Sequence, residues 1–167
     1  ISSLSTDAKT ARISNAFFTF LQLKEAAGIE RAILTGTFSR NRFAPGMHDK
    51  LLTLKGLEGA SAALFSSFSP SALKAAFEEI QSGSDAALVN RWRARALEQA
   101  GQGGFGIDAK AWYDVSTRRI DQFQSLEERL EQELLSTVAE ALENARNASW
   151  LYGLGAVFLL GAVLALI

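Results

Sequence analysis

Apolar residues recur at steps of three and four along most of the chain, and no stretch alternates with period two for long enough to make a strand. This spacing predicts an all-α fold. The expected helices cover residues 3–38, 45–68 and 70–100, and a last helix begins after residue 108. Because the first and last helices outrun the middle ones, we expect an up-down four-helix bundle that stands on a two-helix stalk.

Short breaks separate these helices. Pro45 suits the first turn of the second helix, and Ser69-Pro70 opens the third, which is interrupted at Ser82-Gly83-Ser84. The glycine-rich stretch 101–106 has no preceding strand and is interpreted as a hinge between helices. Asp108 is expected to cap the last helix, which has no further break before the end of the chain.

The final residues, 149–167, contain no charged side chain and are apolar to the end. At ~1.5 Å of rise per residue this stretch spans about 27 Å, close to the hydrocarbon thickness of a bilayer. Trp150 and Tyr152 lie at its start, where aromatic rings settle at a membrane interface. We therefore expect a transmembrane helix at 149–167, truncated at its end, and a helical domain at 1–148. Within that domain, the distal bundle covers about residues 20–125. A chain that begins at Ile1 and stops inside an apolar run is expected to be a segment of a larger protein.

The amino-acid composition excludes several kinds of functional site. The chain has no Cys and one His, which excludes disulfides, thiol nucleophiles and Cys/His zinc sites. A net charge of −1 gives no global reason to expect nucleic acid as a partner. Adjacent carboxylates diverge on a helix, and we find no catalytic constellation, so neither an enzyme nor a metal or cofactor site is expected.

Two arginines interrupt the apolar stripes of the long helices. Arg31 splits the gap between Ala27 and Leu34, and Arg119 splits the gap between Val115 and Phe123. Both guanidinium groups are therefore expected to point into the bundle. A buried arginine must be paired, hydrogen-bonded or in contact with an anion. Periodicity leaves two alternatives open. The first is structural, with an internal salt bridge to a nearby acid such as Glu30 or Asp114, or with Arg31 snorkelling to an edge of the bundle. The second is a site where Arg31 and Arg119 hold a small oxyanion.

Two segments carry a family resemblance. Leu23-Lys-Glu-Ala-Ala-Gly-Ile-Glu-Arg-Ala-Ile-Leu34, with Arg42-Phe-Ala-Pro-Gly46 after it, resembles the second half of bacterial nitrate- and nitrite-sensing (NIT) domains. So does Trp112-Tyr-Asp-Val-Ser-Thr-Arg-Arg-Ile-Asp121 with the following Leu126-Glu-Glu-Arg-Leu130. The resemblance covers roughly residues 10–135. Such domains are all-helical, lie outside the membrane in chemoreceptors, histidine kinases and cyclases, and are taken to respond to nitrate or nitrite.

The resemblance implies that the family's ligand arginines correspond to Arg31 and Arg119, with Lys24, Gly28 and Glu30 in supporting positions. It implies a periplasmic or other extracytoplasmic sensor domain of a bacterial inner-membrane receptor, such as a methyl-accepting chemotaxis protein. The expected partners are nitrate or nitrite, membrane lipid and a second copy of the chain. The alternative is a ligand-free helical module that dimerises or binds a protein partner.

Overall fold

The structure is a computed structural model. It describes the backbone of residues 2–164 and the side chains of residues 7–147 and 150. This part of the chain contains helices and no strand, as the spacing of apolar residues predicts. The helices are α1 (Ser2–Arg40), α2 (Met47–Phe68), α3 (Ser71–Ser82), α4 (Ser84–Glu98) and α5 (Ala109–Leu164).

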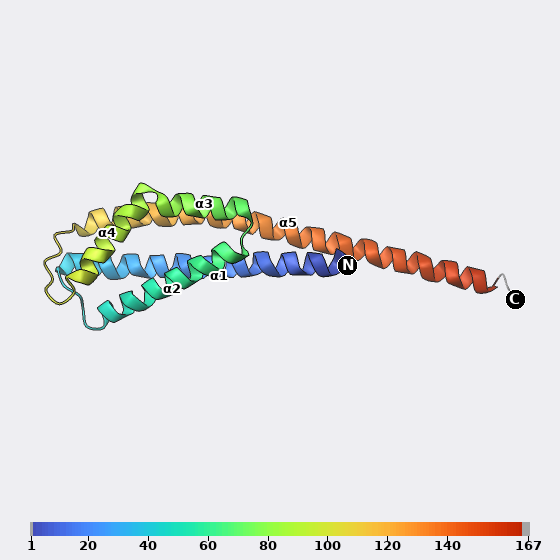
Figure 1. The fold of residues 1–167 in the computed structure, drawn as a ribbon, viewed down its shortest axis with the longest axis horizontal. Coiled ribbons are helices and arrows are strands. Elements are labelled where there is room, and N and C mark those ends of the chain that lie inside the picture. The colour runs from blue at the N-terminus through green and yellow to red at the C-terminus, as the bar shows by residue number, and fades with distance from the viewer. Residues whose placement is uncertain (1, 165–167) are drawn as a thin grey trace.

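The two long helices form the axis of the molecule. α1 and α5 run side by side in opposite directions, α2 lies along α1, and α3 and α4 lie along α5 (Figure 1). α5 contains 56 residues, about 84 Å at the usual rise, and continues well past the N-terminal end of α1 (Figure 1). A displacement of α5 at one end of the molecule can therefore reach the other end through a single helix.

Two of the differences from the predicted helix boundaries have a clear cause in the backbone conformation. α2 begins at Met47, two residues after Pro45, because Gly46 has φ 76° and a left-handed residue cannot belong to the helix. The interruption at residues 82–84 is a complete break, since Gly83 is extended with φ −66° and ψ 163°. α3 and α4 are thus two helices, and the described residues form five helices where four were expected.

The start of α5 is as predicted. Asp108 Oδ1 accepts a hydrogen bond of 2.7 Å from the backbone N–H of Ala111, which is the arrangement of an N-cap. The glycine-rich stretch before it connects α4 to α5 and packs on the end of α1. There Asn41 Oδ1 accepts from Phe105 N at 3.0 Å, and Asn41 O accepts from Gly104 N at 3.2 Å.

The apolar core consists of two clusters along this axis. One cluster lies among α1, α2, α3 and α5 and contains four aromatic rings in mutual contact, namely those of Phe20, Phe65, Phe77 and Phe123. The other lies at the end formed by α4 and the glycine-rich loop, around Phe38, Phe105 and Trp112. The charged residues described below occupy interior positions between the two clusters.

The transmembrane prediction concerns residues at the edge of what the structure describes. The backbone of α5 is helical up to Leu164, but of the side chains from 148 to 167 only that of Trp150 is described. The predicted segment 149–167 therefore lies largely outside the described residues. Among the residues that are described, no helix is both long and apolar enough to span a bilayer.

Candidate functional site

Arg119 points into the bundle, as its place in the apolar stripe of α5 predicts. Its side chain is 3% exposed, and its Nη2 donates to Glu58 Oε1 at 2.5 Å and to Gln81 Oε1 at 2.9 Å. Its guanidinium carbon lies 4.9 Å from the centre of the Phe123 ring. The Nε atom is buried and has no hydrogen-bond partner among the described residues. Arg119 thus combines an internal salt bridge with one unused donor.

Arg31 does not occupy the interior position that we expected. It is half-buried on the flank between α1 and α5, where Nη1 donates to Thr117 Oγ1 at 2.9 Å and the guanidinium carbon lies 5.0 Å from the Tyr113 ring centre. The interior position between Ala27 and Leu34 belongs to Glu30, which is 4% exposed. Either residue splits the seven-residue gap into steps of three and four, but one residue turns a helix by about 100°.

The two predicted anion ligands therefore reach α5 on different faces. Arg31 contacts Thr117, whereas Arg119 lies two residues further on and projects about 200° away around the helix. Arg119 meets α2 and α3 in the interior, through Glu58 and Gln81. No described hydrogen bond or ion pair links Arg31 to Arg119 directly.

Glu30 and Arg119 are the two ends of a buried charge network that four helices supply. Arg93 of α4 makes a two-pronged ion pair with Glu30 of α1, in which Nη2 donates to Oε2 at 2.5 Å and Nε donates to Oε1. The same Nη2 donates to Glu58 Oε2 of α2 at 2.7 Å, and Glu58 in turn accepts from Arg119. Each of the four residues is at most 7% exposed. Two guanidinium groups and two carboxylates thus neutralise one another inside the bundle.

Burial and pairing act in opposite directions on these groups. Burial raises the pKa of Glu30 above its ordinary value, although the hydrogen bonds and charge of Arg93 oppose the shift. Burial by itself would lower the pKa of Arg93, but the hydrogen bonds to Glu30 and the two nearby carboxylates outweigh it and raise that pKa. In this network Arg93 therefore stays charged, whereas burial disfavours the ionised form of Glu30.

The three residues that were expected to support the anion site, Lys24, Gly28 and Glu30, lie in different environments. Lys24 forms an ion pair with Glu127 and donates to Gln124 Oε1 at 2.7 Å, so its charge is neutralised. Gly28 is half-buried, and a Cβ added there would meet nothing within 4 Å. Glu30 supports Arg93 and not Arg31, and Asp114 pairs with Lys110 on the surface at 2.5 Å.

Arg93, Glu58 and Gln81 were not identified from the sequence. A signal was present for Glu58, since Leu51, Leu54, Glu58, Ser61 and Phe65 follow steps of three and four and are all buried. Arg91, Arg93 and Arg95 alternate along α4 and therefore lie on different faces of the helix, and the alternation does not say which of them is buried. Arg93 is the buried one of the three, while Arg91 and Arg95 are exposed.

Other candidate chemistry is absent from the described part of the chain. His48 lies near the surface at 3.1 Å from the carboxylate of Asp49. No group of three or more His, Asp or Glu side chains among the described residues could hold a metal ion.

Comparison with known proteins gives one match. A family model described as nitrate and nitrite sensing matches residues 1–135. No curated protein and no solved structure matches the chain.

Proposed function

The chain belongs to the nitrate- and nitrite-sensing family, and from this premise we propose that it binds nitrate or nitrite through Arg31 and Arg119 as the sensor of a bacterial membrane receptor. The observation that carries the proposal is the buried Nε–H of Arg119, which has no acceptor among the described residues. Buried N–H groups are normally hydrogen-bonded, and an oxyanion is the acceptor that a guanidinium edge favours.

Arg31 supplies the charge in this proposal. The cations near it are neutralised, because Lys24 pairs with Glu127, Arg93 with Glu30, and Arg118 with Asp85. Arg31 has no carboxylate within 4 Å among the described residues, and its described side-chain hydrogen bond goes to the neutral hydroxyl of Thr117. Its planar fork retains donors that suit two oxygens of a trigonal anion.

The long helices supply the output. Because Arg31 and Arg119 reach α5 on different faces, an anion that contacts both would require α1 and α5 to move relative to each other, and its binding would stabilise that shifted position. Because α5 is continuous, a shift of about 1–2 Å at Arg119 would be carried along the helix to its far end. The expected coupling free energy is about 1–3 kcal/mol.

The receptor setting forms part of the same proposal. The uncharged residues 149–167 would cross the bacterial inner membrane, and residues 1–148 would form a periplasmic domain. In that domain α3 and α4 together act as one leg of a four-helix bundle, and a second copy of the chain completes the receptor.

Calorimetric titration of the 167-residue chain in a mild detergent tests the ligand. We expect nitrate or nitrite to bind, and we expect Arg31→Ala to weaken binding by at least about tenfold, the loss typical of a charged hydrogen bond. Arg119→Gln combined with Glu58→Gln keeps the interior free of an unpaired carboxylate and is expected to weaken binding as well. Arg118→Ala is the matched control, because this exposed arginine on the same helix pairs with Asp85.

A second function has its own support. Arg119 and Arg93 are both paired with buried carboxylates, which is what a ligand-free dimerisation or partner-binding module requires. If no heat is observed with nitrate, nitrite or a panel of small carboxylates, the sensor proposal fails and this module takes its place.

A further inference from the structure

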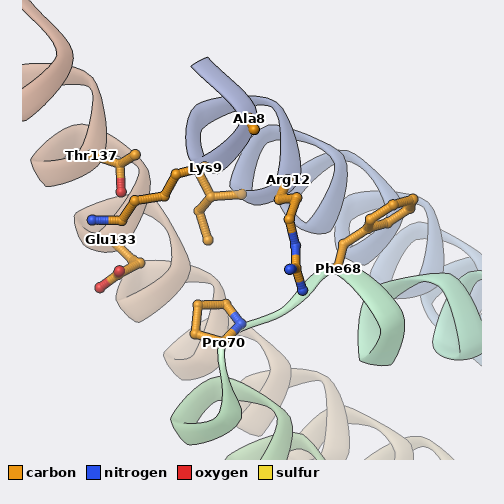
Figure 2. Close-up of a pocket in the computed structure, with 8 residues that line it drawn as sticks. Ala8, Lys9, Arg12, Phe68, Pro70, Glu133 and Thr137 are labelled. Atoms are coloured by element: carbon orange, nitrogen blue, oxygen red, sulfur yellow. The ribbon is translucent and has the colours of Figure 1, made fainter. Parts of the chain in front are cut away.

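A cavity far from the charge network lies between α1 and α5, where the loop from α2 to α3 crosses them. Its volume is about 370 Å³. It is lined by Arg12 and Ile13 of α1, Phe68 and Pro70 at the loop, and Glu133 and Thr137 of α5 (Figure 2). Neither Arg31 nor Arg119 lines this cavity, so it is distinct from the proposed nitrate site.

Thr137 is the first sign that the cavity is a binding site. Its side chain is 1% exposed, and its Oγ1 atom has no hydrogen-bond partner among the described residues. In Figure 2 this oxygen points to the side of the cavity where Lys9 and Glu133 lie. Because buried hydroxyls are normally hydrogen-bonded, Thr137 offers a polar contact to a molecule in the cavity.

Three charged side chains line the cavity, Arg12 and Lys9 of α1 and Glu133 of α5. Arg12 has no carboxylate within 4 Å among the described residues, and its described hydrogen bond is a long one of 3.4 Å to the carbonyl of Ser67. Lys9 pairs with Glu140 at 2.8 Å and also interacts electrostatically with Glu133, which forms no ion pair within 4 Å in the described part. The cavity therefore presents an unpaired cation, Arg12, on one wall, and on the other a carboxylate that shares Lys9 with Glu140.

Apart from Thr137 and these charged side chains, the lining is apolar. Ile13 is 3% exposed and belongs to the aromatic-rich cluster of the core, against which Phe68 also packs. Pro70, in the loop from α2 to α3, also lines the cavity (Figure 2). A ligand that fits must therefore carry both charges and a hydrocarbon body.

We propose that this cavity binds a small zwitterion with an apolar body, of the class of apolar α-amino acids. Its carboxylate is held by the Arg12 guanidinium, its ammonium donates to Glu133 and to Thr137 Oγ1, and its side chain lies on Ile13, Phe68 and Pro70. A simple anion would bring a second negative charge towards Glu133, and a simple cation would face Lys9 and leave Arg12 without a carboxylate. The zwitterion pairs with a charged side chain on each wall and forms a hydrogen bond with the buried hydroxyl of Thr137.

Such a ligand would link α1 to α5 at the end of the bundle where α5 extends beyond its neighbours (Figure 1). It would act on the same pair of helices as nitrate but from a separate site. The inference therefore goes beyond nitrate sensing and does not depend on it.

Calorimetric titration of the 167-residue chain in a mild detergent with L-leucine and L-phenylalanine tests the site. We expect at least one of the two to bind. For leucine, 4-methylpentanoate lacks the ammonium and 3-methylbutylamine lacks the carboxylate, and each is expected to bind at least about tenfold more weakly. For phenylalanine, 3-phenylpropanoate and 2-phenylethylamine are the corresponding probes.

Substitutions of residues that line the cavity test the individual contacts with the amino acid. We expect Arg12→Gln to weaken amino-acid binding by at least about tenfold, and Thr137→Val, which keeps the side-chain shape, to weaken it several-fold. Nitrate binding should be unchanged in both. Arg91→Gln, at an exposed position on α4, is the control and should alter neither. Arg12 is exposed, so its variant is expected to fold, and a thermal melt of each variant checks this.

Three results would each overturn the proposal. They are the failure of both amino acids to bind, equal affinity of the zwitterion and its singly charged analogues, and unchanged binding in a folded Arg12→Gln protein. Loss of nitrate binding in the Arg31→Ala protein, with amino-acid binding retained, would show that the two sites are separate.

Discussion

Charged residues stand at interior positions of four helices, where the apolar pattern alone would place hydrocarbon. Glu30, Glu58, Arg93 and Arg119 each continue a buried stripe of their own helix. Burying any one of these charges without a partner would cost several kcal/mol of folding free energy. Their contacts with one another remove most of that cost. Because the partners lie on other helices, the sequence of one helix does not explain its own buried charge.

Arg93 is the centre of this network, since it bonds both carboxylates. Arg93→Met should lower the free energy of unfolding by about 3–5 kcal/mol, because Glu30 loses its partner and Glu58 keeps only Arg119. Urea unfolding followed by circular dichroism measures the loss. Arg91→Met, two residues away and exposed, should change stability by no more than about 0.5 kcal/mol. Equal stability of the two variants would mean that the network contributes nothing.

Burial of Glu30 also predicts a dependence on pH. Its pKa is raised in the folded protein above the ordinary value of about 4.3, so the folded state holds the proton more tightly than the unfolded state. This carboxyl therefore favours folding most below its unfolded pKa, and the advantage is lost as pH rises through the folded pKa.

Comparison with Glu30→Gln isolates that effect, because the other titrating groups are common to both proteins. Relative to the variant, the wild-type free energy of unfolding should fall as pH increases from about 4 through the raised pKa. Urea titrations at several pH values measure the difference. A wild-type protein that gains stability over the variant in this range would show that Arg93 dominates and lowers the pKa.

At the scale of elements, the helices and their breaks follow closely from local chemistry. The apolar steps of three and four, the Asp108 cap and the break around Gly83 each depend on residues only a few positions apart in sequence, and the structure contains each of these features. The start of α2 was predicted two residues too early because the left-handed conformation of Gly46 cannot be read from Pro45 beside it.

The glycine-rich loop shows how an element depends on a distant neighbour. Gly103 has φ +68°, and a Cβ added to it would lie 2.5 Å from the backbone oxygen of Asn41 at the end of α1. The loop is thus fitted to α1 by a close approach that only glycine permits.

Gly103→Ala should therefore destabilise the protein by about 1–3 kcal/mol, from strain and the clash with Asn41. Gly101→Ala is the matched control, because a Cβ there meets nothing within 4 Å, and its effect should stay within about 0.5 kcal/mol. Thermal melts of both variants measure the difference. If the two alanines proved equivalent, the loop would have to be free of α1.

For the whole molecule, the decisive feature is that two antiparallel helices of unequal length connect its ends. α1 packs along α5 over most of its length, and both proposed ligands would contact this pair (Figure 1). The family match supports nitrate or nitrite as the proposed ligand, and the continuous helix α5 would carry the proposed displacement.

The absence of cysteine makes the path measurable. Spin labels at Ser14→Cys on α1 and Ser136→Cys on α5, both exposed positions, should report a change of about 1–2 Å in their mean separation when nitrate is added. The same pair in an Arg31→Ala background should show no change. An unaltered distance in the labelled protein with nitrate bound would contradict the displacement mechanism.

By itself, the sequence determined that the chain is helical, where the helices break, that α5 is capped and continuous, and that Arg119 points inward, because these depend on contacts within one helix or one turn. Only the tertiary structure decided that Glu30 and not Arg31 faces the interior, and that Arg93, Glu58 and Gln81 meet Arg119. Adjacent residues of a helix point about 100° apart, so a spacing pattern that fits either of two neighbouring residues does not say which of them faces the core. The helices that pack against the stripe decide it. Their contacting residues lie between 35 and 63 residues away in the chain.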